Sequence, residues 1–167
     1  CVTRCSYCSF FAEALGKGRK VPPYLDALAR EMDAGADLLR RKGLKVRALY
    51  VGGGTPTALN AEQLARVLEQ MGRLFPGWRE WTVEAGRPDT IDADKLRAMR
   101  EAGVTRVSVN PQTMNDQTLK LIGRAHTADD VDRAFAMARE TGFENINLDL
   151  IAALPGETVE DFAHTLD

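Results

Sequence analysis

The sequence lacks any long hydrophobic run, and none of its apolar stretches approaches the roughly eighteen residues that a membrane-spanning helix needs. Nor does it open with a basic segment followed by an apolar one, the pattern of a secretion signal. Positive charge is not in excess either, because the net charge is −2, which removes a general electrostatic reason for nucleic-acid binding. We therefore expect a cytoplasmic protein that binds neither membranes nor nucleic acids.

Cysteine is missing from all but the first eight positions. The 167 residues contain only Cys1, Cys5 and Cys8, in the pattern CxxxCxxC. An odd number of cysteines in one loop suits a reducing compartment and a metal site better than disulfides. Thiolates hold iron–sulfur clusters, and three of them would leave one iron of a four-iron cluster without a protein ligand. Zinc is the alternative, although no fourth Cys or His lies at a suitable spacing.

Several common catalytic patterns are absent as well. The chain has no Walker loop and no GxGxxG dinucleotide fingerprint. Ser108 has no neighbouring His–Asp pattern, so nucleophilic catalysis is not expected there. His126 has no second histidine at metal-ligand spacing, and we expect it to be structural.

Apolar periodicity and turn residues indicate strands that alternate with helices along residues 1–167, which we take as a single domain. Connections this short predict a parallel sheet with helices packed outside it. A further helix is expected to begin near the end of the chain. The pattern predicts helices over 24–42, 60–74, 92–102 and 127–141, and strands over 46–51, 81–84, 105–109 and 145–151.

Unusual residues gather after the predicted strands, at the edge where parallel α/β folds place functional groups. The first strand is followed by the triple-glycine turn 52–54, which lets backbone groups approach a ligand amino or carboxylate group closely. Glu84 can accept hydrogen bonds, and Gln112 can both donate and accept. The fork of Arg124 suits a ligand carboxylate. Taken singly, each of these residues also fits an ordinary structural role.

Taken together, the motifs resemble the radical S-adenosylmethionine (SAM) superfamily. The resemblance rests on the cysteine loop, the segment 52–56 (GGGTP), Glu84, and the segments 109–126 and 147–158. The amino-acid sequence of these segments resembles the oxygen-independent coproporphyrinogen III oxidase family, and it is closest to the coproporphyrinogen dehydrogenase (HemZ-like) branch of that family. One departure is the pair Ala152-Ala153, where the family commonly has a glycine.

The resemblance implies a partial TIM-like (β/α) barrel whose first strand and C-terminal part lie outside this sequence, which we expect to be a fragment. It implies that Cys1, Cys5 and Cys8 hold a [4Fe–4S] cluster whose open iron is chelated by SAM. It further assigns SAM contacts to Tyr7, Gly53, Gly54, Thr55, Glu84, Gln112, Arg124 and Asp149.

The function implied by the resemblance is oxidative decarboxylation of coproporphyrinogen III propionates to vinyl groups, with a separate electron donor and a 5′-deoxyadenosyl radical. No further catalytic residue is implied beyond the cluster and SAM ligands. Two alternatives stay open: a haem chaperone of the same family, and a radical SAM enzyme with another substrate. The sequence gives no oligomeric state.

Overall fold

The computed structural model describes residues 1, 3–10 and 18–167. The regular elements are α1 (Val21–Arg41), β1 (Ala48–Val51), α2 (Ala61–Leu74), β2 (Glu80–Glu84), α3 (Ala93–Ala102), β3 (Arg106–Ser108), α4 (Asp116–Leu121), α5 (Ala128–Glu140), β4 (Asn145–Asn147) and α6 (Val159–Leu166). Short 3-10 turns follow β1 and β2, at Pro56–Ala58 and Pro88–Thr90. The alternation of strand and helix confirms the predicted α/β class.

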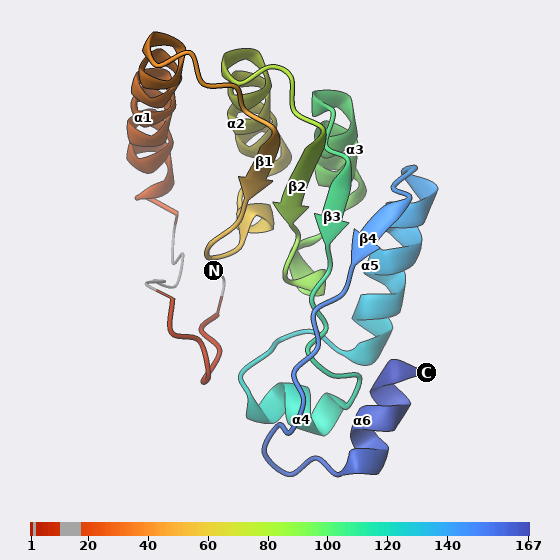
Figure 1. Ribbon diagram of the computed structural model, residues 1–167. Helices are drawn as coiled ribbons and strands as arrows, with labels where there is room; N and C mark the ends of the chain where they lie inside the picture. The colour runs from red at the N-terminus through yellow and green to blue at the C-terminus, as the bar shows by residue number, and fades with distance from the viewer. Residues whose placement is uncertain (2, 11–17) are drawn as a thin grey trace.

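The four strands form one parallel sheet in the order β1-β2-β3-β4. Leu49 lies opposite Trp81, and Val83 lies opposite Val107. Because the strands are parallel, their carboxyl ends meet at one edge, where the arrowheads point in Figure 1. The loop that carries the cysteines lies beyond that edge.

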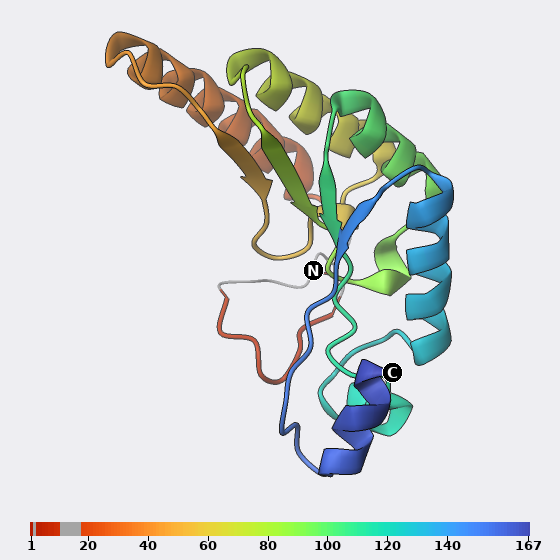
Figure 2. The same cartoon turned by 45° about the vertical axis from the view of Figure 1, so that its right-hand side comes forward.

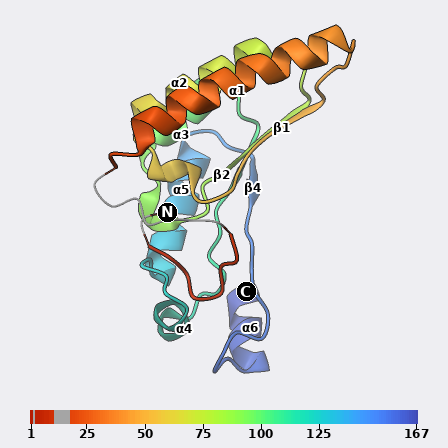
Figure 3. The same cartoon turned by 90° about the vertical axis from the view of Figure 1, so that its left-hand side faces the viewer.

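Helices α1, α2, α3 and α5 lie on the same side of the sheet in all three views (Figures 1, 2 and 3). The core forms between this layer and the sheet, because alternate strand residues point toward the helices. Trp81, Val83 and Val107 from the strands meet Leu64 and Leu96 from the helices, and all five are fully buried. Each such side chain contributes roughly 1.5–3 kcal/mol on burial.

The opposite face of the sheet is polar. Tyr50, which alternates with buried Leu49, is 61% exposed. Arg106 donates to Asn147 Oδ1 at 2.8 Å, and Asn147 in turn donates to Ser108 Oγ at 2.9 Å. A face of this kind suits the interior of a barrel that holds a ligand rather than a second apolar core.

Side-chain caps mark the starts of α2, α3 and α5. Asn60 accepts from the Gln63 amide at 2.8 Å in a capping box, and Asp92 accepts from the Lys95 amide at 2.9 Å. Thr127 forms the corresponding capping box at the start of α5. The single-domain assignment of residues 1–167 stays a prediction.

The structure departs most from the sequence prediction at α1, α4 and β4. Helix α1 begins at Val21, earlier than predicted, because its two prolines occupy first-turn positions, where the missing amide hydrogen costs nothing. Helix α4 was not predicted, since its six residues are too few to show a clear period. The predicted strand 145–151 ends its regular ladder at Asn147, and only Leu150 pairs again, with Gln112.

A candidate cofactor site at the carboxyl edge of the sheet

All eleven residues predicted to bind the cluster or SAM line one pocket, which has a volume of about 230 Å³. They come from the cysteine loop, the glycine turn after β1, the end of β2, the segment after β3, the turn after α4 and the chain after β4. The predicted lining residues are Cys1, Cys5, Tyr7, Cys8, Gly53, Gly54, Thr55, Glu84, Gln112, Arg124 and Asp149. Their individual roles as ligands stay predictions.

The three cysteines are free thiols that line this pocket. Cys5 is 6% exposed, whereas Cys1 and Cys8 are half-buried. The loop is closed by a hydrogen bond from the Cys8 amide to the Cys5 carbonyl at 3.2 Å. Within the described residues, no group of three Cys, His, Asp or Glu side chains converges closely enough to hold a single metal ion.

Gly123 holds the cysteine loop against the turn after α4. Its backbone adopts φ +77°, and a Cβ there would lie 3.1 Å from the Arg4 carbonyl oxygen. The neighbouring Ile122 carbonyl accepts from the Ser6 amide at 3.1 Å. The close approach of these two backbones therefore depends on the missing side chain.

The glycine turn lies directly beside Cys1. Gly53 adopts φ +109°, which a residue with a side chain rarely takes. A Cβ on Gly54 would lie 3.6 Å from Cys1 Sγ, and the Thr55 hydroxyl lies 3.2 Å from the same sulfur. The turn thus presents backbone polar groups next to a cysteine sulfur, as a ligand bridging the two would require.

Arg124 is held in place by two groups of the pocket. Its Nη1 donates to the Gly86 carbonyl at 2.8 Å, and its Nη2 donates to the Tyr7 hydroxyl at 2.8 Å. Burial raises the pKa of Tyr7, and the nearby Arg124 guanidinium partly opposes that rise. The Tyr7 phenol therefore stays protonated near neutral pH.

Each pocket carboxylate is oriented by a neighbour on the polar face of the sheet. The Tyr50 hydroxyl donates to Glu84 Oε1 at 2.5 Å, which raises the pKa of Tyr50 to about 12. Asn147 donates to Asp149 Oδ1 at 2.7 Å. Gly52 leaves room for the first pair, since a Cβ there would lie 2.6 Å from the Tyr50 ring.

Gln112 carries backbone strain at the pocket. Its φ is +73°, which is unusual for a residue with a side chain, and its side chain is buried. The strained backbone is fixed by the segment that follows β4, because the Gln112 amide donates to the Asp149 carbonyl and the Gln112 carbonyl accepts from the Ile151 amide. Such over-determined strain is typical of functional sites.

The radical SAM superfamily model matches residues 1–167. The chain belongs to this superfamily. It is 44% identical to the oxygen-independent coproporphyrinogen-III oxidase-like protein HemZ of Bacillus subtilis, over 99% of the chain and 34% of that protein. It is 39% identical to the heme chaperone HemW of the same organism, over the whole chain and 44% of that protein.

Among solved structures, coproporphyrinogen III oxidase (HemN) from Escherichia coli matches with a TM-score of 0.87 and 34% identity, over 99% of this chain and 38% of that one. This likeness confirms the expected radical SAM fold. The chain thus spans between a third and a half of the relatives it matches, and those relatives include both oxidases and heme chaperones.

The residues present fit the cofactors that a radical SAM protein implies. Three free thiols that line one pocket match the three thiolate ligands that a four-iron cluster with one open iron needs. Donors and acceptors suited to an amino acid head group lie around them. Cys1, Cys5 and Cys8 would therefore hold the cluster, and the other predicted residues would hold SAM.

Sequence reasoning missed one buried charge of this site. Arg87 is 3% exposed and donates to Cys5 Sγ at 3.0 Å. It stands in a Gly-Arg-Pro turn after β2, where an arginine normally reads as a surface residue. Nothing in the spacing of the motif connects it with a cysteine more than eighty positions earlier.

His126 lies outside the radical SAM pocket, in a buried position. Its Nε2 lies 3.2 Å from the Pro111 carbonyl oxygen, and its Nδ1 has no hydrogen-bond partner among the described residues. Burial lowers the pKa of His126 and favours the neutral ring. This placement agrees with a structural role.

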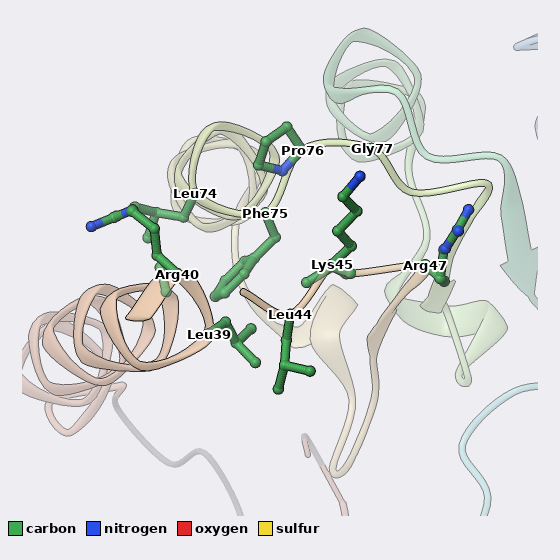
Figure 4. A pocket seen from close by; sticks show the side chains of 11 residues that line it. Leu39, Arg40, Leu44, Lys45, Arg47, Leu74, Phe75, Pro76 and Gly77 are labelled. Atoms are coloured by element: carbon green, nitrogen blue, oxygen red, sulfur yellow. The ribbon is translucent and has the colours of Figure 1, made fainter. Parts of the chain in front are cut away.

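A second pocket, of about 350 Å³, lies at the opposite, amino edge of the sheet (Figure 4). Leu39, Leu44 and Phe75 form its apolar part, and Lys45 and Arg47 extend along one side. None of the eleven predicted residues lines it. In the described part of the chain, no helix is long and apolar enough to cross a membrane; the expected cytoplasmic location stays a prediction.

Proposed function

We propose that this chain is the cluster- and SAM-binding part of an oxygen-independent coproporphyrinogen III oxidase-like enzyme. The observation that carries the proposal is the convergence of all eleven motif residues on one pocket, from six separate segments of the chain. The 44% identity to the HemZ protein supports the choice of reaction. The substrate would be a porphyrinogen whose propionate side chains lose carbon dioxide and become vinyl groups.

A bound cluster and SAM would supply a 5′-deoxyadenosyl radical able to remove a hydrogen atom from an unactivated carbon. The chain's own residues would bind the cluster and SAM and orient them. Cys1, Cys5 and Cys8 would anchor the cluster. The backbone of the glycine turn, together with Glu84 and Asp149, would bind and orient SAM.

No residue of the pocket needs to act as a general acid or base in this reaction. The carboxylates of Glu84 and Asp149 accept hydrogen bonds from Tyr50 and Asn147, which fixes their direction before a ligand arrives. Such preorganisation lowers the cost of ordering a bound ligand. An electron donor, not identified by these residues, would reduce the cluster.

A heme chaperone is the second candidate, because the HemW protein is 39% identical over the whole chain. Both candidates would use the same cluster and SAM pocket. They differ in product: the oxidase releases a decarboxylated tetrapyrrole, whereas a chaperone binds haem and leaves it unchanged.

The deciding experiment is an anaerobic turnover of the full-length protein, reconstituted with iron and sulfide and supplied with SAM, a reductant and coproporphyrinogen III. Mass spectrometry should find 5′-deoxyadenosine together with a porphyrinogen that has lost propionate carboxyl groups. Tight haem binding without that product would favour the chaperone. The absence of SAM cleavage with every substrate would contradict both candidates.

Cys5→Ala should abolish the cluster absorbance and all SAM cleavage, because it removes a buried cluster ligand.

Asp149→Asn should instead leave the iron content unchanged and weaken SAM binding by roughly tenfold, the effect of losing one charge-assisted hydrogen bond. Equal SAM affinity of the wild-type and Asp149→Asn proteins would show that the assignment of Asp149 is wrong.

A further inference from the structure

Arg87 places a positive charge directly against a predicted cluster ligand. Its Nη1 donates to the Thr3 hydroxyl at 2.7 Å, and its Nη2 donates to the Thr3 carbonyl at 2.7 Å and to Cys5 Sγ at 3.0 Å. The residue is 3% exposed. The guanidinium thus ties the cysteine loop to the end of β2 through two residues of the loop.

The charge of Arg87 has no carboxylate partner among the described residues, since its hydrogen bonds go to a hydroxyl, a carbonyl and a thiol. Burying an unpaired charge is costly, and proteins usually pair buried arginine with an anion. A cluster held by three thiolates carries net negative charge next to Cys5. Such a cluster would therefore supply the anion that this buried arginine lacks.

We propose that Arg87 is a positioning residue that raises the reduction potential of the cluster. The inference rests on the proposed function, because it requires a cluster at Cys1, Cys5 and Cys8. Reduction adds negative charge, and a nearby buried cation with an N–H group aimed at a ligating sulfur stabilises the reduced state more than the oxidised one. Burial keeps water from screening the interaction.

The same contacts separate a charge effect from a packing effect. Arg87→Lys keeps the positive charge but loses the fork that bonds Thr3 and Cys5 together. Arg87→Gln removes the charge and keeps a polar side chain. Arg100→Gln makes the same chemical change on α3, where Arg100 contacts the Val104 carbonyl and the Phe143 ring, and serves as the matched control.

The test is an anaerobic redox titration of the reconstituted full-length protein, followed by electron paramagnetic resonance. Arg87→Gln should make the cluster at least about tenfold harder to reduce, a fall of about 59 mV in the midpoint potential of a one-electron couple. Arg87→Lys and Arg100→Gln should stay within about twofold of the wild-type equilibrium. Equal potentials for the wild-type and Gln proteins would overturn the inference.

If the Arg87→Gln protein does not hold iron, its potential cannot be measured, and the iron content of the two Arg87 variants is compared instead. Loss of iron from Arg87→Gln, with retention at wild-type potential in Arg87→Lys, would support the role of charge. Loss of iron from both variants, in proteins that circular dichroism shows to be folded, would overturn the inference. The site would then depend on the shape of the guanidinium group and not on its charge. A wild-type protein that assembles no cluster would instead contradict the proposed function.

Discussion

At the scale of single residues, some side chains of the pocket can be predicted from the sequence and others cannot. Cysteine spacing and the glycine turn could be recognised because each pattern is local. Arg87 could not, because its burial depends on a loop more than eighty positions away. Tyr50 likewise gains its role only when β1 and β2 pair and bring its hydroxyl to Glu84.

Ala153 departs from the family pattern at a position where the backbone favours glycine. Its φ is +59°, and its side chain is exposed. A residue with a Cβ costs roughly 1–2 kcal/mol in the left-handed conformation, and Ala153→Gly removes this cost. Glycine also makes the unfolded chain more flexible, which offsets part of the gain. Ala153→Gly should therefore raise the free energy of unfolding by about 0.5–1 kcal/mol. Urea denaturation measures this difference.

Ala152→Gly is the matched control, since Ala152 is also exposed and its φ is not positive. That change should lower stability by about 0.5 kcal/mol through the flexibility it adds to the unfolded chain. A loss of stability in the Ala153→Gly protein would show that the left-handed conformation is not strained.

His126 should make stability depend on pH. Burial lowers its pKa in the folded state below the usual 6.5, so the folded protein binds fewer protons than the unfolded chain at acidic pH. The contribution is therefore fully present above pH 6.5 and is lost as the pH falls through the folded-state pKa. Denaturation series between pH 7.5 and 5 should show a shallower pH dependence for His126→Gln; an equal slope would contradict this account.

At the scale of elements, capped helices and short apolar strands were predictable because their signals lie within a few residues. The predicted helix starts at Asn60, Asp92 and Thr127 are confirmed, because each of these residues caps its helix. The overlong prediction for β4 has a physical reason. The segment after β3, which would have to pair with the rest of the predicted strand, contains Pro111 and then Gln112. Pro111 has no amide hydrogen to donate, and the positive φ of Gln112 turns the backbone out of the ladder.

Gly123 should couple the turn after α4 to the cysteine loop. In Gly123→Ala the new Cβ would press on the Arg4 carbonyl at 3.1 Å, in addition to the cost of a left-handed alanine. We expect a destabilisation of about 1–2 kcal/mol and a lower iron content after reconstitution. Thermal unfolding and iron analysis of the purified protein measure the two effects.

Gly142→Ala provides the control for strain alone. Gly142 also has a positive φ, +92°, but a Cβ there would meet only the Arg100 Nε at 3.9 Å. This variant should lose less stability than Gly123→Ala, because it lacks the close backbone contact, and it should keep its full iron content. If both variants lose iron equally, the Gly123 contact is not what holds the loop in place.

At the scale of the whole molecule, the two faces of the sheet explain where the site lies. One face is closed by four helices over an apolar core (Figure 2), while the other carries the chain of polar contacts through Arg106, Asn147 and Asp149. The polar face leads to the carboxyl edge, where every predicted cofactor residue meets. The architecture was predictable from the alternation of elements, whereas the second pocket at the amino edge was not.

The central claim is that this pocket holds a [4Fe–4S] cluster whose open iron binds SAM. Mössbauer spectroscopy of the full-length protein, reconstituted with ⁵⁷Fe and measured with and without SAM, tests it most directly. The account predicts a four-iron cluster in which the signal of a single iron site changes when SAM is added. A spectrum that SAM leaves unchanged, or zinc in place of iron in the purified protein, would contradict it.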